Sequence, residues 1–255
     1  MSLYLDIVIS YKSHIFSLHN YSLMKQDKNK YMENNIYYDL NEHSLISPLD
    51  SESTLFEPKI RLGVLASGNG SNFEYIIKSI HNNQLNAEIS ILIVNNPDCL
   101  AIKKAIKYKT PYVIINHRDC NSRLEHDMLV LKKLEDLSVE LVVMAGWMRI
   151  VGEEIINRFK NRLINIHPSL LPSFKGIEAI QQAIENRVTI TGCTVHYVQK
   201  EVDSGSIIIQ AAVPIKEQDS KETLKKRIQK MEHIILPLAI AKVAKNLRTS
   251  FKDKK

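Results

Sequence analysis

The chain has 255 residues, of which 44% are hydrophobic, enough to bury a substantial core as one domain or as one domain plus an extension. Its net charge of +6 is uneven: residues 1–57 hold four Lys and eight Asp or Glu, a net of −4, which leaves +10 for the rest. A basic folded part suits anionic partners such as a phosphate ester or a polycarboxylate. No nucleic-acid motif occurs, and no apolar run approaches the ~20 residues that a membrane span needs, so we expect neither nucleic acid nor a membrane as a partner.

The first part of the chain differs from the remainder. All eight glycines lie at or after Gly63. No basic region precedes the first apolar residues and no Arg occurs before Arg61, which argues against a secretory or organelle signal and indicates a cytoplasmic protein. Residues 1–57 show no sustained period, so we expect a poorly ordered extension; a mis-assigned start, with Met24 or Met32 as the true first residue, is the alternative.

Strand and helix signals alternate from residue 60 onward. Short apolar runs predict strands, and apolar residues three or four apart predict helices. The expected elements are strand 60–66, helix 73–80, strand 89–94, helix 101–108, strand 113–115, helix 124–134, strand 140–145, helix 153–159, strand 163–166, helix 179–186, strands 194–198 and 207–213, and a long helix from Ser220. Because repeated β-α-β units imply a parallel sheet, we predict that residues 58–250 form an α/β domain: a Rossmann-like, mostly parallel sheet with helices on both faces, a late antiparallel hairpin and a long C-terminal helix.

The first strand ends in a loop that leads directly into a helix. The loop reads Ser67-Gly68-Asn69-Gly70-Ser71-Asn72. Its backbone N–H groups and the positive end of the helix dipole would face a bound anion. Phe73 replaces the third glycine of a dinucleotide fingerprint, and Asn95-Asn96 replaces its acidic residue, so a phosphate monoester fits better than NAD. A tight turn with Ser or Asn as helix cap is the alternative.

A second polar cluster follows a later strand. It reads Asn165-Ile166-His167-Pro168-Ser169-Leu170-Leu171-Pro172. Residues two apart in a strand share a face, so Asn165 and His167 would point together beyond the carboxyl end of the sheet, where ligands bind. An amide can donate to a developing oxyanion and an imidazole can move protons near neutral pH, which favours acyl transfer. A structural, hydrogen-bonded histidine is the alternative.

Asp203 lies in the expected turn of the hairpin, within Asp203-Ser204-Gly205. A carboxylate near His167 would raise the pKa of that histidine, although Asp-Ser-Gly is also an ordinary turn sequence. A Ser-His-Asp hydrolase is a rival reading, but no G-x-S-x-G occurs. The three cysteines form no CxxC pair and the histidines no HExxH, so we expect no metal and a reducing environment. The histidines interpreted as surface or core residues are His117, His126, His196 and His233.

Taken together, four motifs resemble the phosphoribosylglycinamide formyltransferases, the folate-dependent glycinamide ribonucleotide transformylases of purine synthesis. They are the loop at 67–72, the segment Ala145-Gly146-Trp147-Met148-Arg149-Ile150, the segment at 165–172, and Val202-Asp203-Ser204-Gly205. The resemblance covers residues 60–245 and is specific because separate motifs occur in order at matching spacing. One departure is Glu178, near which many relatives have a histidine.

The resemblance implies a role for each residue. The residues implied to contact glycinamide ribonucleotide are Gly70, Ser71, Asn72 and Glu232, the first three through its phosphate. The residues implied to bind 10-formyltetrahydrofolate, the co-substrate, are Arg123, Met148, Arg149, Ile150, Val151 and Asn165. Asn165, His167 and Asp203 would be the catalytic set, with His167 as proton donor and Asp203 raising its pKa. The amine would attack the formyl carbon directly and release tetrahydrofolate.

Other readings stay open at this point. Formyltetrahydrofolate hydrolase shares the Asn-His and Asp motifs but replaces the phosphate loop and carries a regulatory domain, for which residues 1–57 are too short. A methionyl-tRNA formyltransferase would need a further C-terminal domain. A non-catalytic phosphate- or folate-binding module is the alternative from another class. The sequence is compatible with a monomer or a homodimer.

Overall fold

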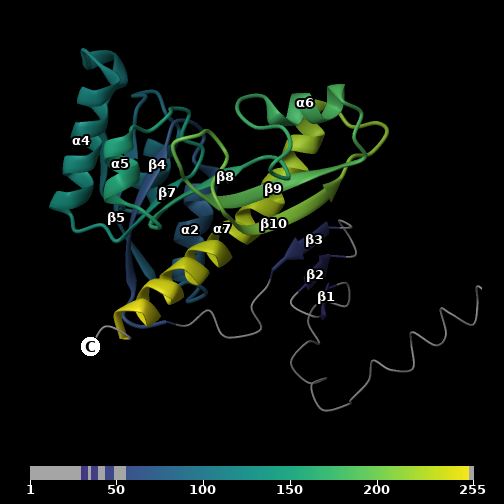
Figure 1. Ribbon diagram of the computed structural model, residues 1–255, viewed down its shortest axis with the longest axis horizontal. Helices are drawn as coiled ribbons and strands as arrows, with labels where there is room; N and C mark the ends of the chain where they lie inside the picture. Colours follow the sequence, from purple (N-terminus) through teal and green to yellow (C-terminus); the bar gives the residue numbers. More distant parts are fainter. Residues whose placement is uncertain (1–29, 34–35, 40–43, 49–55, 253–255) are drawn as a thin grey trace, which may run out of the picture.

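A ten-stranded sheet runs through the part of the chain that the computed structural model describes, namely residues 30–33, 36–39, 44–48 and 56–252 (Figure 1). The strands are β1 (Lys30–Glu33), β2 (Ile36–Asp39), β3 (Ser44–Ser47), β4 (Ile60–Ala66), β5 (Ala87–Val94), β6 (Tyr112–Ile114), β7 (Leu141–Met144), β8 (Leu163–His167), β9 (Ile190–Tyr197) and β10 (Ile207–Pro214). The helices are α2 (Ser71–His81), α3 (Ala101–Lys107), the short 3-10 helix η2 (His117–Asp119), α4 (Arg123–Asp136), α5 (Glu153–Arg158), α6 (Ala179–Glu185) and α7 (Lys221–Lys252).

The strand order is β1-β2-β3-β10-β9-β8-β7-β4-β5-β6. The strands β6, β5, β4, β7 and β8 are parallel neighbours, whereas β9 pairs antiparallel with β8 and with β10. From β4 to β10 the sheet is therefore mostly parallel and ends in an antiparallel hairpin. The predicted α/β fold is confirmed, including this late hairpin and the long C-terminal helix.

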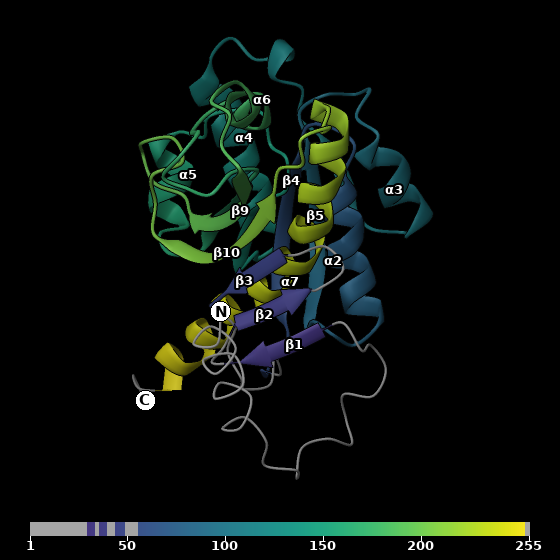
Figure 2. The same ribbon diagram turned by 90° about the vertical axis from the view of Figure 1, so that its right-hand side faces the viewer.

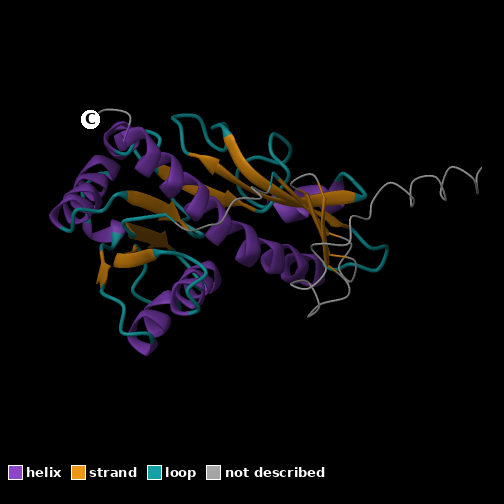
Figure 3. Ribbon diagram, turned by 90° about the horizontal axis from the view of Figure 1, so that it is seen from below, coloured by secondary structure: helices purple, strands orange, loops and turns teal. Residues whose placement is uncertain are grey.

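Helices cover both faces of the parallel part of the sheet (Figure 3). Val64 and Leu65 are consecutive in β4 and fully buried, yet they belong to two different hydrophobic clusters. The cluster of Val64 includes residues of α2, α3 and α7, and the cluster of Leu65 includes residues of α4 and α5. Strands covered on both faces read as continuous apolar runs, which is why the sequence shows them so clearly.

The long helix α7 packs along the sheet and is fixed at both ends. At its start, Arg227 donates two hydrogen bonds of 2.7 Å to the carboxylate of Asp219. Near its end, Arg248 donates to both carboxylate oxygens of Glu140, at 2.8 and 3.1 Å, beside the first residue of β7. The first pair holds α7 to the loop before it and the second ties it to the start of β7, and the same helix reaches the carboxyl edge of the sheet.

Residues 30–33, 36–39 and 44–47 form strands in a part of the chain whose sequence shows no sustained period. β3 pairs antiparallel with β10, placing Ile46 opposite Ala211, and β2 and β1 continue the sheet beyond it (Figure 2). The side chain of Ile46 is fully buried in the hydrophobic core. Each strand has four residues, which is too short for a period-2 pattern to stand out. β3 is positioned by pairing with β10, a strand that lies some 160 residues further along the chain.

Candidate active site

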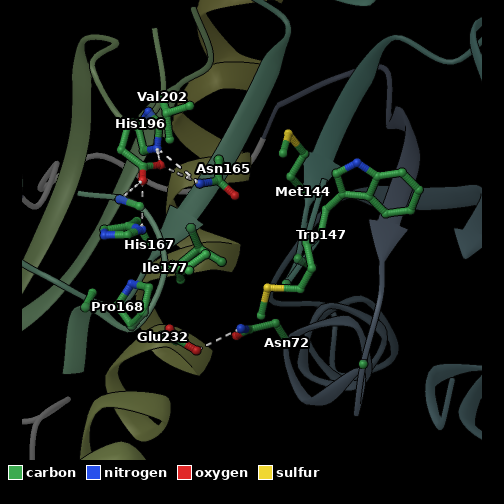
Figure 4. Close-up of a pocket in the computed structure, with 18 of the residues that line it drawn as sticks. Asn72, Met144, Trp147, Asn165, His167, Pro168, Ile177, His196, Val202 and Glu232 are labelled. Atoms are coloured by element: carbon green, nitrogen blue, oxygen red, sulfur yellow. Dashed lines mark hydrogen bonds and ion pairs between the residues drawn. The ribbon is translucent and has the colours of Figure 1, made fainter. Parts of the chain in front are cut away.

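A cavity of about 650 Å³ lies at the carboxyl edge of the sheet (Figure 4). Parallel neighbours β4, β7 and β8 end at this edge, and the segments that follow them line the cavity together with the β9–β10 loop and one face of α7. The sequence-predicted residues that line it are Gly70, Ser71, Asn72, Met148, Arg149, Ile150, Val151, Asn165, His167, Asp203 and Glu232. Motifs separated by up to 162 positions thus meet in one place.

The loop after β4 has the geometry of an anion-binding turn. Gly70 adopts φ 69° and ψ 29° directly before α2, and a Cβ at this position would lie 2.6 Å from the Cβ of Ala101. Only glycine meets both conditions without strain. The loop therefore turns tightly and presents the first N–H groups of an 11-residue helix to the cavity.

Asn72 and Glu232 form a hydrogen-bonded pair between α2 and α7. Asn72 Nδ2 donates to Glu232 Oε2 at 2.9 Å, and both side chains are buried. Burial raises the pKa of Glu232, and the bond from Asn72 only partly offsets this. Oδ1 of Asn72 is buried and has no hydrogen-bond partner among the residues that the structure describes. A bound ligand with a donor group would satisfy this oxygen.

Asn165 and His167 each lie within hydrogen-bonding or ion-pairing distance of Asp203. His167 Nδ1 is 3.3 Å from Asp203 Oδ2, and Asn165 Nδ2 is 3.4 Å from Asp203 Oδ1. The second nitrogen of His167, Nε2, faces the carbonyl oxygen of Phe174 at 2.8 Å. The backbone N–H of Gly176 donates to Asp203 Oδ2 at 2.8 Å. The turn that carries Asp203 thus folds over the end of β8, as the sequence-based hypothesis required.

Burial, hydrogen bonds and nearby charges together shift the pKa values of this cluster. Burial lowers the pKa of His167 below its ordinary value, and this outweighs the raising effects of the Phe174 carbonyl and of the Asp203 carboxylate. The expectation that Asp203 raises the pKa of His167 holds for its own contribution but not for the sum. Burial opposes ionisation of Asp203 too, yet hydrogen bonds from His196 and Gly176 and the nearby His167 leave its pKa below the usual value.

His196 belongs to the same cluster, although the sequence did not indicate it. Its Nε2 lies 3.5 Å from Asp203 Oδ1 and 3.2 Å from Asn165 Nδ2, and its ring is buried. His196 in β9 is the direct register partner of Asn165 in β8. A histidine inside an expected strand was the available signal, but its partner depends on strand register, which the sequence does not reveal.

The segment after β7 forms an apolar wall of the cavity. Met148 and Ile150 are 77% and 55% exposed, and Ile177 across the cavity is 82% exposed (Figure 4). Large apolar side chains exposed in a cavity are typical of a site that an apolar ligand covers. Arg123 lies elsewhere: it is exposed at the first residue of α4 and is not among the residues that line this cavity.

A family model described as Formyl transferase matches residues 60–240. The chain belongs to the formyl transferase family. The human trifunctional purine biosynthetic protein adenosine-3 is 43% identical to it over 186 residues, and the chicken protein of that name is 42% identical. These matches cover 73% of this chain but only 18% of either relative, so the chain spans less than a fifth of their length.

Solved structures support the same family. Glycinamide ribonucleotide transformylase 1 from Symbiobacterium toebii is 39% identical, with a TM-score of 0.71 over 72% of this chain and 86% of that one. Phosphoribosylglycinamide formyltransferase from Bacillus halodurans is 38% identical, with a TM-score of 0.70 over 72% of this chain and 94% of that one. The family assignment made from the four motifs is confirmed. The strands β1 to β3 lie before the residues that the formyl transferase model matches.

Two further features of this formyl transferase family member concern the described residues only. None of their helices is both long and apolar enough to cross a bilayer. Within the same residues, no group of three or more His, Cys, Asp or Glu side chains is arranged to hold a metal ion.

Proposed function

We propose that this protein transfers the formyl group of 10-formyltetrahydrofolate to the amine of glycinamide ribonucleotide, which yields formylglycinamide ribonucleotide and tetrahydrofolate. The observation that carries the proposal is that one cavity is lined both by the His167–Asp203 pair and by the anion-binding turn at Gly70. A site with acyl-transfer residues and a phosphate site within one small cavity suits a phosphorylated amine as acceptor.

The acceptor would bind between the turn and α7. Its phosphate would accept hydrogen bonds from the N–H groups at the start of α2 and from the hydroxyl of Ser71. Lys225, which lines the cavity from α7 as Glu232 does, would add positive charge. Glu232 would accept a hydrogen bond from a hydroxyl of the ribose. The folate ring would cover Met148 and Ile150, removing their exposed apolar surface from water.

The proposed chemistry starts from a neutral His167, because burial lowers the pKa of its imidazole. The acceptor amine attacks the formyl carbon and gives a tetrahedral intermediate, with negative charge on oxygen and an excess proton on nitrogen. Once Nε2 leaves the Phe174 carbonyl, this nitrogen of a neutral imidazole can take that proton, and Asp203 at Nδ1 stabilises the imidazolium that forms. The imidazolium then returns the proton to the departing nitrogen of tetrahydrofolate. No covalent enzyme intermediate is needed.

Asn165 would stabilise the oxyanion, but only after a rotation. Its amide nitrogen faces His196 and Asp203, and its oxygen faces the cavity (Figure 4). Turning the amide about χ2, a torsion with a broad energy minimum, would bring an N–H group toward the oxyanion. We infer that ligand binding is accompanied by this turn.

An assay of the purified protein tests the proposal. Release of tetrahydrofolate is measured from 10-formyltetrahydrofolate with glycinamide ribonucleotide, with the dephosphorylated glycinamide ribonucleoside, and without an acceptor. We expect release with the ribonucleotide and a kcat/KM at least 100-fold lower with the ribonucleoside, equivalent to about 2.7 kcal/mol of lost phosphate binding. Release that does not depend on the acceptor would indicate a hydrolase, and binding without release would indicate a non-catalytic module; either outcome would overturn the proposal. Cytoplasmic location and the monomer or homodimer state stay predictions.

A further inference from the structure

The wall segment Trp147–Gly152, which follows β7, has neither helix nor strand, although its middle residues face the cavity. A segment without a backbone ladder keeps one shape only if its ends are held. One end is held by Ser67, whose Oγ accepts a hydrogen bond of 2.8 Å from the N–H of Met148. The other end is held by a residue from a different part of the chain, Asp127 in α4.

Asp127 approaches the wall segment closely. Its Oδ2 accepts a hydrogen bond of 2.7 Å from the N–H of Gly152, and a Cβ at position 152 would lie only 2.8 Å from that oxygen. Asp127 is 3% exposed, and a buried carboxylate is costly unless donors or a positive charge compensate it. Its other oxygen, Oδ1, faces Nδ1 of His126 at 3.3 Å.

His126 links this carboxylate to the opposite end of the wall segment. Its ring is fully buried, its Nε2 faces the carbonyl oxygen of Ile115 at 3.1 Å, and it stacks on Trp147 with ring centroids 5.9 Å apart and an interplanar angle of 22°. Neither His126 nor Asp127 lines the cavity, whereas Trp147 does. His126 and Asp127 therefore contact the wall segment but not the cavity, and they can affect a bound ligand only through the position of that segment.

We propose that His126 and Asp127 are positioning residues that hold the wall segment in the shape that binds the formyl donor. The proposal rests on the proposed function, in which Met148 and Ile150 cover the folate ring. It explains why two polar side chains are buried behind an apolar wall, and it predicts an effect confined to one substrate. The acceptor site depends instead on the turn at Gly70 and on Glu232, which Asp127 does not contact.

The test compares Asp127→Ala, Asp127→Asn and the control Asp136→Ala, which removes an exposed carboxylate from the same helix. We expect Asp127→Ala to raise the KM for 10-formyltetrahydrofolate about tenfold and to leave the KM for glycinamide ribonucleotide within about twofold, as expected when binding to one substrate alone is lost. Asp127→Asn keeps an acceptor for Gly152 and should restore most of the loss. If Asp127→Ala does not fold, Gly152→Ala takes its place with the same expectation. Equal changes in both KM values, or none beyond the control, would overturn the proposal.

A second measurement needs no activity. Trp147 is the only tryptophan of the chain and is 7% exposed, so its fluorescence reports on the wall segment alone. In the folded variant without ligand, we expect emission shifted to longer wavelength relative to the wild type and to Asp136→Ala. An unshifted spectrum would overturn the positioning role. A shifted spectrum in a protein whose wild type transfers no formyl group would support the positioning of the wall and refute the proposed function.

Discussion

Asp203 joins the polar side chains of the cavity because each of its carboxylate oxygens contacts two neighbours. Oδ2 accepts from the Gly176 N–H and faces His167, while Oδ1 faces His196 and Asn165. The pairing of Asn165 with His167 could be predicted from their spacing in one strand. The contacts of His196 with Asp203 and Asn165 could not be predicted, because they depend on the register between β8 and β9.

Loss of the His167 imidazole should affect the reaction more than binding. We predict that His167→Ala lowers kcat by 10² to 10⁴-fold, the usual contribution of general acid–base catalysis, with little change in either KM. Steady-state kinetics measure this, with the exposed His81→Ala as control. A kcat near that of the wild type would show that His167 does not move the proton.

The pH profile of the reaction follows from the lowered pKa of His167. Because the neutral imidazole accepts the proton, kcat/KM should fall as pH drops through that pKa, with a midpoint below the ordinary 6.5. Asp203 raises the pKa of His167, so Asp203→Asn should move the acidic limb to still lower pH, besides reducing the rate. A limb that moves to higher pH in this variant would contradict the account.

At the scale of elements, apolar patterns located the strands and helices well because both faces of the parallel sheet are covered. The position of Arg123 could not be derived in this way: the expected helix began at residue 124, and the sequence pattern did not show that this helix end lies outside the cavity lining. The orientation of a helix end depends on packing between layers, here the contact of α4 with the cluster around Leu65.

The start of α7 provides a pH-dependent test of stability. Hydrogen bonds from Arg227 lower the pKa of Asp219 from 3.8 to about 2. The ionised carboxylate therefore adds stability above pH 3.8, and this is lost as pH falls from 3.8 toward 2. Asp219→Asn should lower the free energy of unfolding by about 2 kcal/mol at pH 7 and by almost nothing near pH 2.

Denaturant unfolding at several pH values measures this difference. The exposed Asp98→Asn serves as the control, because its carboxylate is solvated and should change stability by less than about 0.5 kcal/mol. A loss for Asp219→Asn that is the same at both pH values would mean that packing, rather than charge, explains the effect.

For the whole molecule, the sequence predicted a boundary after the first 57 residues but not the strands within them. Composition marked the boundary near Pro58, but the strands before it were not predicted, because β3 is stabilised by pairing with β10 rather than by its own pattern. The assignment of residues 58–250 as one catalytic domain stays a prediction. Because Ile46 of β3 is buried in the same hydrophobic cluster as residues of that domain, the question is whether β3 contributes to the stability of the domain.

Two neighbouring substitutions answer that question. Ile46 is fully buried and Leu45 is 37% exposed in the same strand. We predict that Ile46→Ala lowers the free energy of unfolding by about 2 to 4 kcal/mol and that Leu45→Ala lowers it by less than 1 kcal/mol. Equal and small losses in urea unfolding would mean that β3 adds nothing to the stability of the fold.

The central claim is that both substrates meet in one cavity and exchange a formyl group directly. The most direct test is the stoichiometry of products, with formylglycinamide ribonucleotide identified by mass spectrometry and tetrahydrofolate by absorbance in the same reaction. The account predicts one formylated ribonucleotide for each tetrahydrofolate formed, and loss of both products together in His167→Ala. Tetrahydrofolate formed in excess, with free formate in place of the missing product, would contradict it.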